Sequence, residues 1–140
     1  MIEIARTEGR SSAPPEAFYR RWADIDTHHE WAVTMEYARL DEPFALGATG
    51  WLKAKGGDPA PFTVTEIIDG RVFADDTALD GATLRIRHEA QPDGDGSRLI
   101  ITGLIDGPRR DEYATAIADD VQQSIETNLA SLTAHLEKQA

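Results

Sequence analysis

Three ionisable residues, Glu66, Asp75 and His88, are spaced so that they could cooperate in proton transfer. Each lies in a strand-like run, and Asp-Gly pairs at positions 69–70 and 80–81 separate the runs. Asp-Gly favours a two-residue hairpin turn, because both positions of a type I′ turn need positive φ. Two such turns would place all three side chains on one face, with Asp75 diagonal to His88 at roughly 6 to 8 Å between backbones. A carboxylate that orients an imidazole makes a general base near neutral pH.

A structural role for these three residues is the alternative interpretation. A lone histidine on a sheet is commonly a satisfied core or rim residue. The inward orientation also depends on the turns, because a change of one residue in either turn would send all three groups to solvent. Glu66, Asp75 and His88 are therefore candidates for catalysis.

The same register predicts which face of the sheet is buried. The opposite face receives Arg85, Arg87 and Glu89, whereas the face that carries the three candidates is mainly apolar. We therefore expect the apolar face to be concave and covered. Its other members are Phe62, Val64, Phe73, Thr77, Leu84 and Ile86.

The element that must cover this face is a helix predicted over residues 111–136. Apolar residues recur there every three or four positions, and the segment contains no Gly or Pro. The stripe consists of Tyr113, Ile117, Val121, Ile125, Leu129, Leu132 and Leu136. We expect the C-terminal half to close the core and the N-terminal half to face a ligand. Ser124 and Asn128 lie in or beside the stripe, so they either contact a ligand or its water, or bond locally.

The rest of the chain predicts six further elements. Residues 2–7 and 33–38 alternate as strands, and 47–54 form another, before the strands on either side of the two Asp-Gly turns, and a last strand with Leu99, Ile101 and Ile105 follows the loop over 91–96. Pro and Glu after Ser12 start a short helix that ends near Ala23, and a second helical turn spans 24–30. The order is strand, two short helices, six strands and a long helix, which predicts one α+β domain over residues 1–140.

This order resembles the START-like (SRPBCC) superfamily, in particular its polyketide cyclase/dehydrase and lipid-transport group. The segments that carry the resemblance are 13–22, 47–51, 61–66, 82–88 and 105–108. The resemblance implies a helix-grip fold, in which a seven-stranded curved antiparallel sheet wraps round the C-terminal helix. It also implies an elongated apolar cavity between sheet and helix.

The resemblance implies binding of an apolar or amphipathic small molecule in that cavity. An aromatase/cyclase-type enzyme that uses inward His88 with Asp75 or Glu66 is the alternative, and a protein-interaction module is a third. The expected ligand-binding residues are Trp31, Met35, Trp51, Phe62, Val64, Phe73, Asp75, Thr77, Leu84, Ile86, His88, Tyr113, Ile117 and Val121. Trp31 and Met35 are expected at the entrance, and Tyr113 either reaches the mouth or only packs.

Composition excludes several other functions. The formal net charge of -11 opposes binding to phosphate backbones and anionic lipids, so we expect no nucleic-acid partner. The chain has no Cys, and the adjacent His28 and His29 do not complete a metal site. Phosphate-binding glycine motifs are absent, and we expect no cofactor. The first residues lack a basic leader, and no run is long enough to span a membrane, so a cytoplasmic protein is expected.

Overall fold

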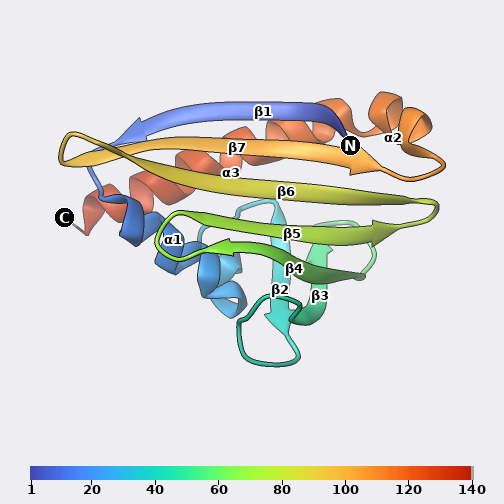
Figure 1. The fold of residues 1–140 in the computed structure, drawn as a ribbon, viewed down its shortest axis with the longest axis horizontal. Coiled ribbons are helices and arrows are strands. Elements are labelled where there is room, and N and C mark those ends of the chain that lie inside the picture. Colours follow the sequence, from blue (N-terminus) through green and yellow to red (C-terminus); the bar gives the residue numbers. More distant parts are fainter. Residues whose placement is uncertain (140) are drawn as a thin grey trace.

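The computed structural model describes residues 1–139, which form a curved sheet, short helices and one long helix (Figure 1). The first half contains β1 (Ile2–Ser11), α1 (Pro15–Ala23), the 3₁₀ helix η1 (Ile25–Glu30), β2 (Met35–Leu40), β3 (Thr49–Ala54) and β4 (Ala60–Ile68). The second half contains β5 (Val72–Leu79), β6 (Ala82–Asp93), β7 (Gly96–Asp106), α2 (Arg110–Ala116) and α3 (Ala118–Lys138).

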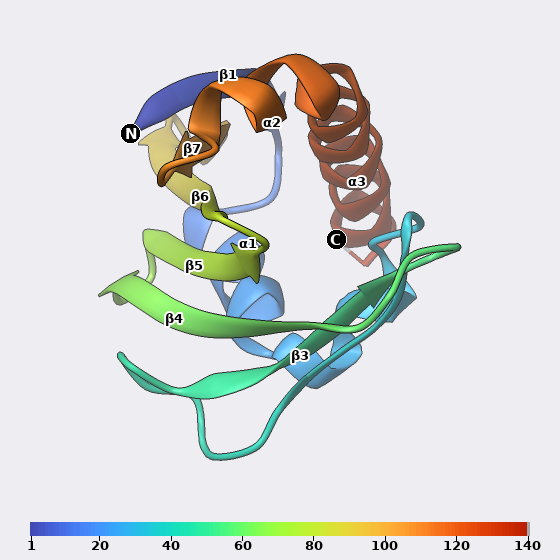
Figure 2. The same ribbon diagram turned by 90° about the vertical axis from the view of Figure 1, so that its right-hand side faces the viewer.

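The seven strands form one antiparallel sheet in the order β1-β7-β6-β5-β4-β3-β2. Figure 2 shows the sheet curving, with α3 on its concave side. Trp22 of α1 packs on His88 of β6, so the short helices cover one end of that side. The predicted α+β helix-grip fold is confirmed.

The two Asp-Gly turns differ. Leu79 pairs with Ala82 across the second turn, so its loop contains the two predicted residues. Gly81 has a φ of 78° but Asp80 has no positive φ, so the turn is not of the predicted type I′. At the first turn Ile68 pairs with Val72, so the loop contains three residues, and the predicted two-residue turn is wrong there. A β-bulge at Thr65 offsets the extra loop residue.

The bulge divides β4 into a part that keeps the predicted register and a part that does not. Val64 faces Asp75 and Phe62 faces Thr77, as predicted. Beyond the bulge Glu66 pairs with Ala74 instead of Phe73. Because side chains alternate along a strand, this one-residue shift turns Glu66 to the convex face.

The C-terminal helix bends at Ile117, so the predicted unbroken helix over 111–136 is wrong at that residue. Ile117 has φ -119° and ψ -4°, between α2 and α3. The hydrogen bonds continue, because Ile117 N–H donates to Tyr113 and Val121 N–H donates to Ile117. α2 contacts the ends of β1, β6 and β7, whereas α3 runs along β1 and β7. One straight helix could not follow both courses.

Burial along α3 follows the predicted division only in part, because Ile125 and Leu129, which were expected to close the core, also line the cavity described below. Ile125, Leu129, Leu132 and Leu136 are buried, whereas Val121 is half-buried. Val121 lies over Gly103 of β7, where an added Cβ would come within 2.9 Å of its Cγ1 atom. The missing side chain at Gly103 therefore allows the N-terminal half of α3 to approach the sheet closely. No helix within residues 1–139 has the length and apolar character needed to cross a membrane.

Candidate functional site

A cavity of about 320 Å³ lies between the concave face of the sheet, the segment from η1 to β2, and α3. Most of its lining side chains are apolar. The polar or ionisable ones, apart from the indole of Trp31, are His28, Asp58, Asp75, Thr77, His88, Ser124 and Asn128. Among the described lining residues there is no lysine or arginine. The cavity thus combines a broad apolar wall with a few polar groups and no cationic side chain other than histidine.

Nine of the predicted ligand-binding residues lie in the cavity wall. They are Trp31, Met35, Phe62, Asp75, Thr77, Leu84, Ile86, His88 and Val121. They come from five elements and one connecting segment, and the register of β4, β5 and β6 aligns the six that lie on these three strands.

The other five predicted residues do not line the cavity. Val64 and Phe73 are fully buried in the core behind the wall. Trp51 is 37% exposed, because its neighbour Leu52 takes the inward position on β3. Tyr113 donates its hydroxyl hydrogen bond to the Asp80 carbonyl instead of reaching the cavity, and Ile117 occupies the helix bend.

Asp75 is a carboxyl group in the cavity wall without a charged partner. Burial raises its pKa to about 7, and the neighbouring charge of Asp76 adds to the effect. Asp76 faces the other side of β5, where Arg85 donates two hydrogen bonds to its carboxylate at 2.7 and 3.0 Å. Adjacent aspartates on one strand therefore have opposite environments, one ion-paired and one facing the cavity.

His88 is held by the backbone. Its Nδ1 lies 3.1 Å from the Phe73 carbonyl oxygen, which can only accept a hydrogen bond, so Nδ1 carries the proton and Nε2 is an acceptor. Burial, together with nearby His28, lowers the pKa of His88 to about 3. The ring stacks on Phe73, with 5.3 Å between centroids, and contacts Trp22 at a tilt of 45°, with 5.1 Å between centroids. His88 is therefore a neutral, fixed imidazole.

His28 shows the same pattern at the other side of Phe73. Its Nε2 donates to the Trp22 carbonyl at 2.7 Å, and burial lowers its pKa to about 4. The two adjacent histidines have different environments, because η1 buries His28 and exposes His29. Neighbouring positions in a tight 3₁₀ turn point in different directions, and the pair itself gave no signal of which one was buried.

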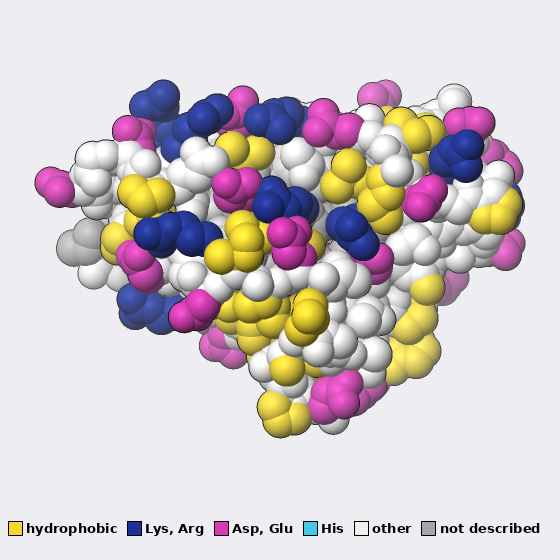
Figure 3. Space-filling view, viewed as in Figure 1, with side chains coloured by type: hydrophobic (Ala, Val, Ile, Leu, Met, Phe, Trp, Pro, Cys, Tyr) yellow, Lys and Arg dark blue, Asp and Glu magenta, His cyan; other side chains and the backbone are white. Residues whose placement is uncertain are grey.

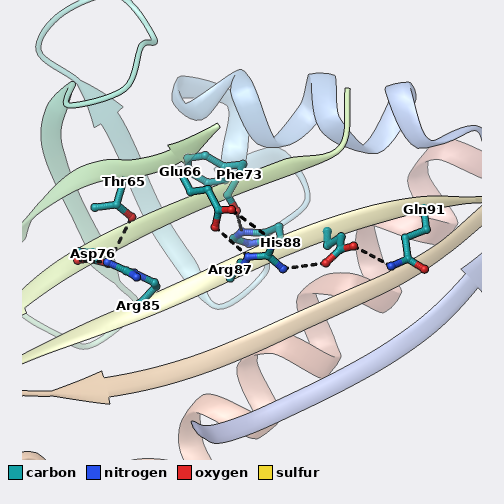
Figure 4. A network of polar contacts seen from close by, with 9 residues as sticks. Thr65, Glu66, Phe73, Asp76, Arg85, Arg87, His88 and Gln91 are labelled. Carbon is teal, nitrogen blue, oxygen red and sulfur yellow. Dashed lines mark hydrogen bonds and ion pairs between the residues drawn. The ribbon is translucent and has the colours of Figure 1, made fainter. Parts of the chain in front are cut away.

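The predicted Asp75–His88 pair does not form as a hydrogen-bonded unit. Both side chains line the cavity, but within residues 1–139 no hydrogen bond joins them, and the Phe73 carbonyl orients the imidazole instead. The inward position predicted for Glu66 is wrong: its carboxylate accepts hydrogen bonds from Arg87 at 2.8 and 3.4 Å on the convex face (Figure 4). The β-bulge at Thr65 causes this outcome.

Convex-face charges are paired with one another. Arg87 also donates to Glu89 at 2.7 Å, and Gln91 donates to the same carboxylate (Figure 4). In the space-filling view of this face, basic and acidic side chains alternate among apolar ones (Figure 3). The arginines of β6 are thus engaged outside the cavity.

A polar cluster on the helix side includes one residue that sequence reasoning missed. The hydroxyls of Thr34 and Ser124 lie 2.9 Å apart, and Asn128 donates to the Thr34 hydroxyl at 2.9 Å. Ser124 and Asn128 line the cavity while bonding locally. Their place beside the apolar stripe signalled this role, whereas Thr34 was assigned to the strand predicted over 33–38 and in the structure lies just before β2, which begins at Met35. No group of three or more His, Asp or Glu residues in the described part of the chain forms a metal site.

The fold is similar to those of several solved structures. A Thermobifida fusca protein has a TM-score of 0.77 at 15% identity, over 96% of this chain and 93% of that chain. A Chromobacterium violaceum protein has a TM-score of 0.70 at 20% identity, over 94% and 95%. DynU16, from the dynemicin biosynthetic locus, has a TM-score of 0.72 at 14% identity, over 95% of this chain and 46% of that one.

A search of curated proteins gave no match. The strongest evidence of relationship comes from a family comparison that covers nearly the whole chain. Residues 2–137 match the family described as polyketide cyclase / dehydrase and lipid transport. Together with the curved sheet, the long C-terminal helix and the cavity between them, this match shows that the chain belongs to that family.

Proposed function

We propose that this protein binds a small apolar or amphipathic molecule in the cavity between the sheet and α3. The observation that carries the proposal is the cavity itself, whose volume of about 320 Å³ lies at the lower end of the range of small-molecule sites. Burying apolar ligand surface contributes about 25 cal/mol per Å², so an apolar wall supplies affinity. Asp75, His88 and the Ser124–Asn128 pair supply orientation.

Tryptophan fluorescence tests this proposal directly. Trp31 lines the cavity and is 5% exposed, and its indole N–H has no partner among the described residues. A naphthalene derivative that enters the cavity would contact this indole. We expect saturable quenching in the natural protein and loss of at least about half of it in Trp31→Phe, because contact quenching acts over short distances.

Trp51→Phe is the matched control, because Trp51 is 37% exposed and lies outside the cavity. Quenching should persist in this variant with unchanged affinity. Equal loss of quenching in both variants, or no saturation in the natural protein, would show that the probe binds elsewhere or not at all.

Acid–base catalysis is a second candidate function, and Asp75 favours it. A carboxyl group with a pKa of about 7 inside an apolar cavity can accept or donate a proton near neutral pH. His88, whose pKa is about 3, is a much weaker base. The structure therefore favours Asp75 over the predicted His88 as the proton-transfer group.

Ring opening of 5-nitrobenzisoxazole measures this capacity. A base removes the proton on the ring carbon, the C–N bond becomes a nitrile, and the N–O bond breaks to release a coloured phenolate. We expect the rate to exceed that of free carboxylate by about 100-fold and to rise through pH 7. Asp75→Asn should remove most of the acceleration, whereas Asp76→Asn should retain it. A rate unaffected by Asp75→Asn would eliminate this second function.

A further inference from the structure

The ionisable groups of the cavity wall on the sheet side are placed as hydrogen-bond acceptors, and Thr77 beside them carries a hydroxyl that can accept or donate. Asp75 offers a carboxylate, and His88 offers Nε2, because its Nδ1 proton is engaged by Phe73. The two residues occupy neighbouring strands at diagonal positions, since Asp75 pairs with Ile86 and His88 with Phe73. A ligand group that donates hydrogen bonds would therefore match the two acceptors, Asp75 and His88.

The charges of the cavity-lining residues also favour a ligand that donates hydrogen bonds. Asp58 also lines it, and among the described lining residues no lysine or arginine opposes the two carboxylates. On the convex face, the two neighbouring carboxylates have cationic partners: Asp76 pairs with Arg85, and Glu66 pairs with Arg87. Asp75 is thus a carboxylate that the protein leaves without a cation and directs into its cavity.

We infer that the molecule bound in the cavity carries a protonated amine, which pairs with Asp75 while the apolar remainder packs against the sheet and α3. An ammonium group has three donors and no acceptor, which matches two facing acceptors. An anionic head group would instead meet the like charge of Asp75 with no cation to offset it, and the exposed Asp58 adds a second negative charge to the cavity lining. The inference deepens the proposed function and depends on it.

Three probes of one shape separate the head groups: 1-naphthylmethylamine, 1-naphthalenemethanol and 1-naphthoic acid. At pH 7.5 the first is cationic, the second neutral and the third anionic. We expect isothermal titration calorimetry to give the tightest binding for the amine and an affinity at least about tenfold lower for the acid, with the alcohol between them.

Asp75→Asn tests whether Asp75 sets this order. Affinity for the amine should fall at least tenfold, and affinity for the alcohol should change by less than about threefold, because the amide keeps the size of the side chain. Asp76→Asn, on the convex face of the same strand, should preserve the order. Equal binding of amine and acid, or equal losses of amine and alcohol in Asp75→Asn, would refute the inference and leave cavity binding intact. Failure of all three probes to bind would instead refute the proposed function, and the inference with it.

Discussion

Asp75→Asn is expected to raise the free energy of unfolding of the ligand-free protein by about 3 kcal/mol at pH 8. The carboxylate of Asp75 faces a cavity without a cationic partner, and burial raises its pKa from the usual 3.8 to about 7. Above pH 7 the folded protein must therefore hold a poorly solvated charge. Asparagine keeps the shape and removes the charge, so the folded state becomes more stable.

The stabilisation must grow with pH. Between about pH 4 and pH 7 the unfolded chain has lost the Asp75 proton while the folded chain retains it, so rising pH lowers the stability of the natural protein. Above pH 7 both states are ionised and the difference stays constant. The gain from Asp75→Asn should therefore be about 1 kcal/mol at pH 5 and reach its full size above pH 7.

The two histidines change stability with pH in the opposite direction, so their contribution must be separated from that of Asp75. His28 and His88 have lowered pKa values, so the folded protein loses stability as pH falls below 6.5. Both histidines remain in the variant, and their contribution cancels in the difference between the two proteins. Urea unfolding of both proteins at pH 5, 6, 7 and 8 measures that difference.

Asp76→Asn is the control for this prediction. It removes a half-buried ion pair with Arg85 on the convex face, and we expect a loss of about 1 kcal/mol instead of a gain. If Asp75→Asn were neutral at pH 8, or if its effect did not change between pH 5 and pH 8, water or a partner would have to stabilise the Asp75 charge, and its proposed role would be wrong.

Sequence patterns predicted this fold well because local signals and long-range pairing agree over most of it. The second Asp-Gly turn fixes Phe73 opposite His88, and the alternation of β5 and β6 then follows. The first Asp-Gly turn carries the same signal but holds three loop residues, and the bulge at Thr65 offsets the change. No residue type marks that bulge, and so the orientation of Glu66 was not predictable.

The cavity wall was predicted only in part, because only some of its residues lie in segments with a periodic pattern. Strand positions follow from period-two alternation, which placed Asp75, Ile86 and His88 correctly. Residues contributed by connections and by η1, such as His28 and Asp58, have no such period. The hydrogen bonds of the site could not be predicted from the sequence. The Phe73 carbonyl that orients His88 belongs to the backbone and has no sequence signature.

Some residues of α3 pack only in the core, whereas others line the cavity, and substitutions in the two groups should have opposite effects. Leu132 is fully buried and does not line the cavity, whereas Val121 is half-buried and does. Leu132→Ala should lower the free energy of unfolding by about 3 kcal/mol, because it removes buried methyl groups and leaves a void. Urea unfolding measures the loss, and the affinity for 1-naphthalenemethanol should stay within about twofold.

Val121→Ala should show the reverse pattern. Its side chain is only half-buried, with one methyl group over Gly103 and part of its surface facing the cavity, so the loss of stability should be about 1 kcal/mol or less. The ligand, however, loses part of an apolar wall, and each lost methylene contact of about 0.8 kcal/mol corresponds to roughly a fourfold weaker affinity. If both variants lost stability equally and bound the probe equally well, the N-terminal half of α3 would be core like the rest, and the ligand would have to lie elsewhere.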